Sequence, residues 1–328
     1  MRKTILAQGI PAAALLWILH VAPTWAAANK VWVSNAGVDN GTCGAVTLPC
    51  ASLPQAHDNA AAGGEIGVLT PGDYGVATTP RLQILKSIFI TDDGTGEAAI
   101  LGGGDTVVIA AGAGDVVSLR GLVIDGQVNG ARGVVIQSAS AVHIQNCVIR
   151  NYEGTFGHGI AAIPTTSMQL FVSDTIVFNN GSVASSAAVL LQPQSTVSIS
   201  AVLDRVHLED NVIGLLVDGT QSTGDGSHVV VRDSVMSGNV SDGIRALSAA
   251  GKASAFLLLE RNSSVGNVGN GILANGPRAT MLLDDNTVTR NRAGISAVNS
   301  GQLISYGNNR VNNNIGADGT PTGNYSPL

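Results

Sequence analysis

The sequence predicts an all-β fold, a right-handed parallel β-helix with three short strands per rung. Three observations predict it. A short motif recurs along the chain, each repeat holds three short apolar runs, and the composition favours strands and turns over helices. The 328 residues include 41 glycines, and charged residues make up 12% of the chain, about half the share usual in soluble domains.

The repeated motif spans six residues: Asn or Asp, any residue, an apolar residue, two further residues, and Asn. The clearest copies cover residues 146–151, 174–179 and 286–291, and looser copies begin at Arg120, Asp204, Asp233, Asn262 and Asn308. Aligned on their third positions, successive copies are 22 to 30 residues apart. A repeat of this length indicates a solenoid.

The content of each repeat indicates which solenoid. An apolar run such as 256–259 precedes the motif, and a glycine followed by an aliphatic residue, such as Gly271 and Ile272, follows it. No repeat has room for a helix of ten residues, which excludes helical solenoids, and propeller blades need about 40 residues. Three strands per repeat therefore form one rung, and neighbouring rungs pair at about 4.8 Å.

Asparagines at the turns are expected to stack from rung to rung. Asparagine tolerates the left-handed backbone of a sharp corner, and stacked asparagine side chains hydrogen-bond along the column. We expect Asn211 and Asn239 to serve in the two copies that end in Glu209 and Gly238. The remaining members of the predicted column are Asn151, Asn179, Asn267, Asn291 and Asn313.

Residues 1–28 have the layout of a secretory signal peptide. Arg2 and Lys3 precede an apolar core over 10–21, and alanines at 26–28 offer a cleavage site. The alternative is a membrane anchor, but the apolar core is short for a membrane span. We therefore expect export, with no membrane span after cleavage.

The mature chain, 29–328, is predicted to be a single β-helix domain. Its first part, 29–64, holds a strand, a disulfide loop and a capping helix over 53–62, with Ser52 as the helix cap. Rungs fill 65–306, and 307–328 forms an irregular tail. We expect a monomer.

The cysteine spacing and the net charge indicate which bonds and ligands the chain can form. Cys43 and Cys50 lie in a turn-rich stretch and are predicted to form a disulfide in an exported protein, with two free thiols as the alternative. Cys147 is interpreted as a small buried residue. No spacing indicates a metal site. Without Arg2 and Lys3, 15 basic residues face 23 acidic ones, a net charge of −8, which argues against nucleic-acid binding.

Several segments resemble one family of proteins, namely exported bacterial right-handed β-helix repeat proteins of the pectin-lyase-like superfamily. These segments are 31–34, 62–69, 71–75, 115–122, 143–149 and 305–309. The resemblance covers nearly all of the mature chain and implies the fold and export. The superfamily includes pectate lyases, polygalacturonases, epimerases, adhesins and non-catalytic scaffolds, so the fold does not choose an activity.

If the protein is a lyase, the resemblance implies calcium-binding carboxylates and a basic residue that abstracts a proton. The candidates are Asp204, Arg205 and Asp233, with Glu260 and Arg261 on the next repeat. The preferred interpretation is that these groups neutralise one another across neighbouring rungs. The pair Asp284 and Asp285 should point to opposite faces of its strand. No cofactor is expected, and calcium enters only under the lyase alternative.

A second candidate region lies at 151–159. His158 stands in a Gly-His-Gly sequence that resembles a polygalacturonase motif, and Tyr152 and Glu153 precede it in a long loop. The motif otherwise marks a turn into the strand that starts at Gly159. Tyr152 and Glu153 are the candidate binding residues, because sugars often stack on aromatic side chains.

The sequence therefore favours a secreted, non-catalytic protein, periplasmic or extracellular. Its elongated surface would meet a polysaccharide or another cell-surface component. The alternative is a polysaccharide lyase or glycoside hydrolase that acts on uronate polymers.

Overall fold

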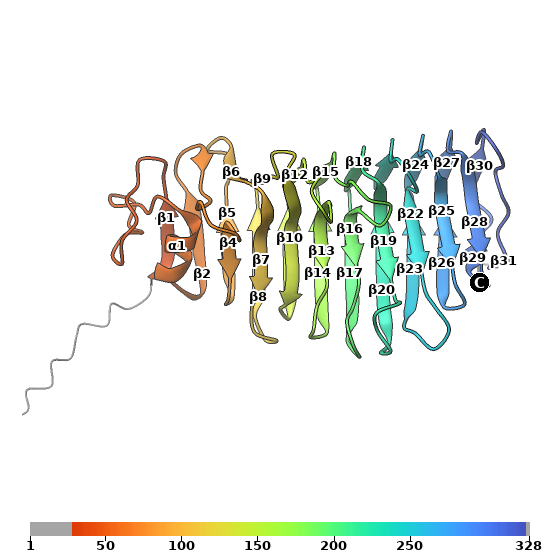
Figure 1. The fold of residues 1–328 in the computed structure, drawn as a ribbon, viewed down its shortest axis with the longest axis horizontal. Helices are drawn as coiled ribbons and strands as arrows, with labels where there is room; N and C mark the ends of the chain where they lie inside the picture. The colour runs from red at the N-terminus through yellow and green to blue at the C-terminus, as the bar shows by residue number, and fades with distance from the viewer. Residues whose placement is uncertain (1–27, 326–328) are drawn as a thin grey trace, which may run out of the picture.

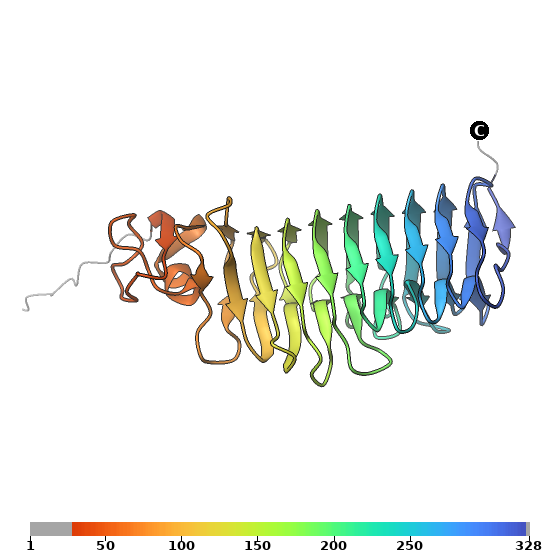
Figure 2. The ribbon, with the colours of Figure 1, turned by 90° about the horizontal axis from the view of Figure 1, so that it is seen from above.

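The computed structural model describes residues 28–325, which form an elongated rod of stacked rungs (Figure 1). Every pairing between its strands is parallel, and the strands build three sheets of 12, 10 and 9 members. Figure 2 shows the successive rungs side by side along the rod. The predicted three-strand rung of a parallel β-helix is confirmed. No helix among the described residues is long and apolar enough to cross a membrane.

The longest sheet, called the long sheet below, receives the first strand of each rung. Its inward residues form apolar columns; Val142, Leu170 and Ala201 are direct neighbours on consecutive strands and are almost fully buried. Its members are β1 (Ala28–Val33), β2 (Ala60–Val68), β5 (Ile88–Thr91), β8 (Val116–Arg120), β11 (Ala141–Gln145), β14 (Met168–Ser173), β17 (Ser198–Asp204), β20 (Gly226–Arg232), β23 (Ser254–Glu260), β26 (Ala279–Asp284), β29 (Gln302–Ser305) and β31 (Gly323–Asn324).

The ten-stranded sheet holds the second strand of each rung, and these strands are short because a sharp corner bounds each end. Its members are β3 (Gly72–Asp73), β6 (Ala98–Leu101), β9 (Leu122–Asp125), β12 (Val148–Arg150), β15 (Ile176–Phe178), β18 (His207–Glu209), β21 (Val235–Ser237), β24 (Ser263–Val265), β27 (Thr287–Thr289) and β30 (Arg310–Asn312). Strands β30 and β31 give the segment predicted as an irregular tail some regular structure.

The nine-stranded sheet completes each rung. Its members are β4 (Leu82–Ile84), β7 (Gly104–Ala110), β10 (Gly130–Ser138), β13 (His158–Ala162), β16 (Ala187–Leu191), β19 (Ile213–Asp218), β22 (Ile244–Leu247), β25 (Asn270–Asn275) and β28 (Ala293–Val298). Inward side chains from the three sheets meet in one continuous apolar core.

The corner between the ten-stranded and nine-stranded sheets contains a buried asparagine ladder. The side-chain amide of each member donates to the side-chain oxygen of the next, as Asn239 does to Asn267 Oδ1 at 2.8 Å, and the last member, Asn314, donates to Asp318 Oδ1 at 2.8 Å. The ladder consists of Asn180, Asn211, Asn239, Asn267, Asn291 and Asn314.

The single predicted column of asparagines is therefore two adjacent columns. Asn267 and Asn291 belong to the ladder, and Asn211 and Asn239 join it as expected. The predicted members outside the ladder come one residue earlier, where the backbone is left-handed, with φ between 53° and 64°. They are Asn151, Asn179 and Asn313. Asparagine therefore has two roles at neighbouring positions: one column adopts the left-handed backbone of the corner, and the other forms the hydrogen-bonded ladder.

Helix α1 (Leu53–Asn59) covers the amino-terminal end of the core. Ser52 caps it as predicted, accepting a hydrogen bond from the Gln55 N–H at 3.3 Å. The helix was expected to continue to residue 62, but it ends at Asn59 because the chain then pairs with β1, starting with Ala60 against Ala28. Sheet pairing overrides the helix propensity of the alanine run.

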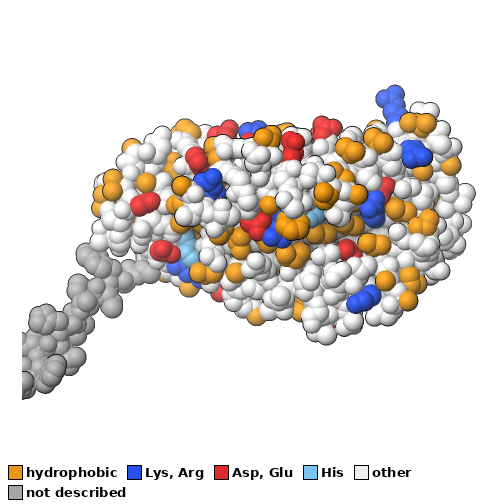
Figure 3. All heavy atoms as spheres, viewed as in Figure 1, with side chains coloured by type: hydrophobic (Ala, Val, Ile, Leu, Met, Phe, Trp, Pro, Cys, Tyr) orange, Lys and Arg blue, Asp and Glu red, His pale blue; other side chains and the backbone are white. Residues whose placement is uncertain are grey.

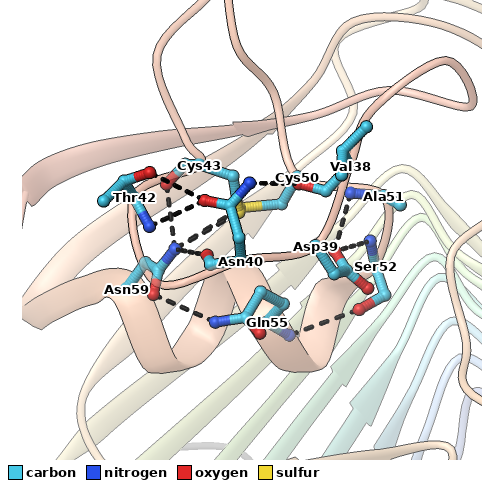
Figure 4. The surroundings of a disulfide bond; sticks show 10 residues. All are labelled: Val38, Asp39, Asn40, Thr42, Cys43, Cys50, Ala51, Ser52, Gln55 and Asn59. Atoms are coloured by element: carbon cyan, nitrogen blue, oxygen red, sulfur yellow. Dashed lines mark hydrogen bonds between the residues drawn. A yellow bond between two sulfur atoms is a disulfide. The ribbon is translucent and has the colours of Figure 1, made fainter.

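The predicted disulfide between Cys43 and Cys50 is present, and both sulfurs lie beside α1 (Figure 4). The Asn59 side chain donates to the backbone oxygens of Asn40 and Cys43, both at 2.9 Å. The loop and the capping helix therefore form one unit. The predicted signal peptide, 1–28, falls almost wholly outside the described residues.

Candidate functional site

The sequence-predicted residues Asp204, Arg205 and Asp233 lie at the corner between the long sheet and the ten-stranded sheet, together with charged residues of neighbouring rungs. We call this group the charged corner. The last residue of a long-sheet strand and the left-handed residue after it both point outward, so each rung presents two side chains. Its members are Asp174, Asp204, Arg205, Arg232, Asp233, Glu260 and Arg261.

Arg205 is paired on two sides. Its Nε and Nη2 donate to the two Asp174 oxygens at 2.7 and 2.9 Å, one rung away. Its Nη1 bonds to Asp204, whose other oxygen accepts from Arg232 Nε at 3.0 Å. The Asp204 carboxylate is therefore shared between two arginines.

The same arrangement recurs two rungs further along the rod. Arg261 donates to both Asp233 oxygens at 2.8 and 2.9 Å and to Glu260 at 2.7 Å. Bonding to arginine lowers the pKa of the Asp174 and Asp233 carboxyls and raises that of Arg205 and Arg261. The predicted neutralisation between rungs is present: each arginine of the charged corner pairs with a carboxylate on a neighbouring rung.

These pairings restrict the chemistry that the charged corner can perform. A carboxylate that acts as a general base or a calcium ligand must offer a free oxygen lone pair to its substrate or metal. Both oxygens of Asp174, Asp204 and Asp233 already accept hydrogen bonds from arginine. Each oxygen keeps a second lone pair, but pairing with arginine lowers the pKa of Asp174 and Asp233 and so makes them weaker bases.

Asp284 and Asp285 form no joint site. Asp284 accepts a hydrogen bond from the Asn308 amide at 2.7 Å, and Asp285 pairs with Arg310 at 3.2 Å. They were expected on opposite faces, yet both side chains are partly exposed. The left-handed backbone of Asp285, with φ of 49°, breaks the alternation of a strand.

A shallow depression of about 550 Å³ lies beside the charged corner. Arg120 borders it, with a half-exposed side chain whose Nε is 3.6 Å from Asp93. It is lined by Arg120, Gln145, Asn146, Ser173, Asp174 and Arg205.

His158 lies on a different sheet from the charged corner. It is the first residue of β13, after the left-handed Gly157, and only 7% of its surface is exposed. Its Nδ1 accepts a hydrogen bond from the Ala187 N–H at 3.1 Å. Burial lowers its pKa to about 4, so the ring is neutral at pH 7. The structure does not bring His158 together with Asp204 or Asp233.

Tyr152 and Glu153 are neighbours in sequence but differ in environment. Tyr152 is fully buried, its hydroxyl donates to Thr106 Oγ1 at 2.8 Å, and its N–H donates to Asn180 at the start of the asparagine ladder. Burial raises the pKa of this phenol. Glu153 lies at the surface and accepts from the Asn179 amide at 3.0 Å. Tyr152 therefore packs in the core and offers no face to a ligand.

One group of three side chains among residues 28–325 has the spacing of a metal site: Asp39, Cys43 and Cys50. The two sulfurs are bonded to each other, and metals bind the thiolate form of cysteine. Asp39 Oδ1 accepts from the N–H groups of Ala51 and Ser52 at 2.7 and 2.9 Å. This group is therefore a loop anchor in the oxidised protein.

Sequence reasoning missed a second depression, on the outer side of the nine-stranded sheet. It measures about 430 Å³, and all of its lining residues are uncharged: Gln137, Ser138, Ile163, Thr165, Gln192 and Gln194. Polar residues at the ends of successive strands were the available signal. They were overlooked because they belong to no charged or aromatic motif.

Comparison with known proteins supports the fold. The crystal structure of pectate lyase Pel9A matches with a TM-score of 0.55 at 12% sequence identity, covering 88% of this chain and 80% of that one. A rhamnogalacturonan lyase matches with a TM-score of 0.36 at 12% identity, covering 87% of each chain. No curated protein sequence matches. The family model "Right handed beta helix region" matches residues 129–315, more than half of the chain, and the chain therefore belongs to the right-handed β-helix family.

Proposed function

We propose that this protein is an exported, non-catalytic β-helix scaffold whose elongated surface binds a polysaccharide or another cell-surface component. The signal-peptide pattern at 1–28 and the Cys43–Cys50 disulfide support export, since disulfides persist in oxidising compartments. The proposed location is the periplasm or the cell exterior.

The pairing of carboxylates at the charged corner carries this proposal. Asp204 and Asp233 each hold arginine on both oxygens, so their most direct role is to neutralise charge between rungs. His158, the remaining candidate acid or base, is buried on another sheet with Nδ1 occupied. A rod with self-neutralising charges suits adhesion along an extended polymer better than proton transfer.

A turnover assay tests the absence of catalysis. The protein is incubated with polygalacturonate and rhamnogalacturonan, with and without calcium, and unsaturated and reducing-end products are measured. We expect no product above a heat-denatured sample, together with measurable binding to an immobilised polysaccharide. Product formation that is lost in Asp204→Asn or Asp233→Asn, and retained in the surface control Asp225→Asn, would overturn the proposal.

The depression beside the charged corner favours a second candidate, a polysaccharide lyase or glycoside hydrolase that acts on uronate polymers. Arg120 and Arg205 border this depression with Asp174 between them, and arginine binds carboxylates well. The fold match to a pectate lyase is consistent with this candidate. In the same assay, Arg120→Ala would abolish turnover if Arg120 took part, and calcium dependence would identify a lyase.

A further inference from the structure

The depression on the outer side of the nine-stranded sheet, called the amide pocket below, has the features of a built binding site. It lies where β10, β13 and β16 run into their next turns, and it involves side chains from three consecutive rungs. Its volume of about 430 Å³ falls within the range of small-ligand sites. Apolar side chains gather along the middle of the rod in the view of Figure 3.

Gln192 is held in one orientation by a buried carboxylate. Its Nε2 donates to Asp218 Oδ2 at 2.7 Å, and Asp218 Oδ1 accepts from the Thr220 N–H at 2.8 Å. Asp218 is only 7% exposed. A carboxylate only accepts hydrogen bonds, so the Gln192 Oε1 must point away from Asp218. The pocket thus contains a preoriented acceptor.

The other polar groups of the pocket complement this acceptor. Gln137 is exposed, and its side-chain amide makes no hydrogen bond to the rest of residues 28–325. The Gln194 amide donates to the Gln192 backbone oxygen at 2.8 Å and makes a long hydrogen bond of 3.4 Å to Gln192 Oε1, which keeps a second lone pair for a ligand. The pocket therefore offers a fixed acceptor on Gln192 and an adjustable donor and acceptor on Gln137.

One apolar side chain, that of Ile163, takes part in the lining of the pocket. Ile163 lines it and packs against a small cluster that includes Leu190 and Leu216. Leu190 and Leu216 are 6% and 4% exposed, although they belong to a cluster separate from the main core. A single apolar side chain among amide and hydroxyl groups suits a ring that has one apolar face and a rim of hydroxyls.

We propose that the amide pocket binds an uncharged sugar unit of a polysaccharide. This inference rests on the proposed function and specifies its ligand. Hydroxyl groups of the sugar donate to Gln192 Oε1 and exchange hydrogen bonds with the Gln137 amide, while the ring packs on Ile163. None of the lining residues carries a charge, and the nearest charge that orders the pocket is the buried Asp218 carboxylate. A uronate ring would find repulsion and no cationic partner here.

Titration of the intact protein with oligosaccharides tests the proposal. The probes are neutral hexasaccharides of glucose, xylose and mannose, with hexagalacturonate as the acidic comparison, and the readout is calorimetric affinity. We expect at least one neutral probe to bind more tightly than hexagalacturonate. Gln137→Leu and Gln192→Leu should each weaken that binding about tenfold, the effect of losing roughly one hydrogen bond at 1.4 kcal/mol.

The control is Gln302→Leu, an exposed glutamine on the long sheet, which should bind as the parent protein does. Because Gln137 is at the surface, its substitution leaves folding intact, and equal melting temperatures verify this. Neutral binding that is unchanged in both pocket variants, or a preference for hexagalacturonate, overturns the amide pocket but leaves the scaffold function standing. Failure to bind any immobilised polysaccharide overturns both.

Discussion

Arg205 and Asp174 occupy the same left-handed corner position on successive rungs, with φ of 52° and 50°, and form a bidentate ion pair. Asn146, Asp233, Arg261 and Asp285 extend this column. Aspartate and asparagine tolerate the left-handed region, whereas arginine has no such preference. Charges of opposite sign alternate along the column from Asp174 to Arg261. Neighbouring rungs therefore attract each other at this corner, where charges of one sign would repel.

Replacing Arg205 with Asn should lower the melting temperature slightly at low salt, and the loss should shrink at high salt. Asparagine keeps the left-handed corner, as Asn146 does, so the change removes the ion pairs with Asp174 and Asp204 without disturbing the backbone. Exposed ion pairs contribute little and are screened when the Debye length falls to about 3 Å near 1 M salt. Calorimetry at two salt concentrations measures this, with Arg278→Asn as the exposed control. A loss that is independent of salt would show that the effect is not electrostatic.

The asparagine ladder should be far more sensitive than the charged corner. Asn239 is fully buried; it donates to the Leu208 carbonyl at 3.1 Å and accepts from the Asn211 N–H at 3.0 Å. Asn239→Ala removes the side-chain partner of the Asn211 N–H and one hydrogen bond to the Leu208 carbonyl. We expect a loss of about 2 to 4 kcal/mol in the free energy of unfolding.

Urea denaturation of the Asn239→Ala variant measures this loss, with the exposed Asn312→Ala as control. A loss below about 0.5 kcal/mol, the range of ordinary surface substitutions, would mean that the ladder contributes little. Irreversible unfolding would leave the rate of unfolding as the comparison between the two variants.

The sequence was sufficient to predict the solenoid, because apolar columns, short strands and turn residues repeat together. The register between strands of successive rungs was harder to predict. Aligning Asp204 with Asp174 places Val206 opposite Ile176, but the structure pairs Ile176 with His207 and Ser173 with Asp204. The left-handed corner residue of that rung is Arg205, a residue type that gives no corner signal. The alignment on acidic residues therefore slipped by one position.

The candidate sites were less predictable than the fold. The opposite charges of the charged corner are visible in the sequence as adjacent acidic and basic residues. The burial of Tyr152 is not, since it depends on Thr106, which precedes it by 46 residues. The amide pocket requires side chains from three rungs, and Gln192 becomes an acceptor only through Asp218. Such contacts follow from the register, which the repeat alone did not determine.

His158 should make the protein sensitive to mild acid. Its pKa is about 4 in the folded protein and 6.5 when exposed, so the unfolded chain binds a proton more readily between these values. Its contribution is fully present above pH 6.5 and is lost as the pH falls toward 4, by roughly 3 kcal/mol at most. His57, whose pKa is also lowered by burial, acts in the same direction.

Denaturation of the parent protein and of His158→Gln across pH 4 to 7 isolates this contribution. Glutamine can accept from the Ala187 N–H without titrating. The variant should show a flatter dependence of stability on pH, with His57 supplying part of the remaining slope. Parallel curves for the two proteins would show that His158 is not the titrating group.

Reduction of the Cys43–Cys50 disulfide should loosen the amino-terminal cap before the rungs. The bridge closes a short loop, for which chain entropy predicts roughly 2 kcal/mol of stabilisation. The Asn59 amide ties this loop to the end of α1, and Leu53 and Ala56 of the helix belong to the core. Hydrogen exchange with and without a reductant should therefore show faster exchange over 30–60, while β17 and β20 remain protected. The control is the double variant Cys43→Ala/Cys50→Ala, in which the reductant should have no effect. This result would exclude a contribution from the buried Cys147 thiol. Uniform acceleration along the rod would mean instead that the cap and the rungs unfold as one cooperative unit.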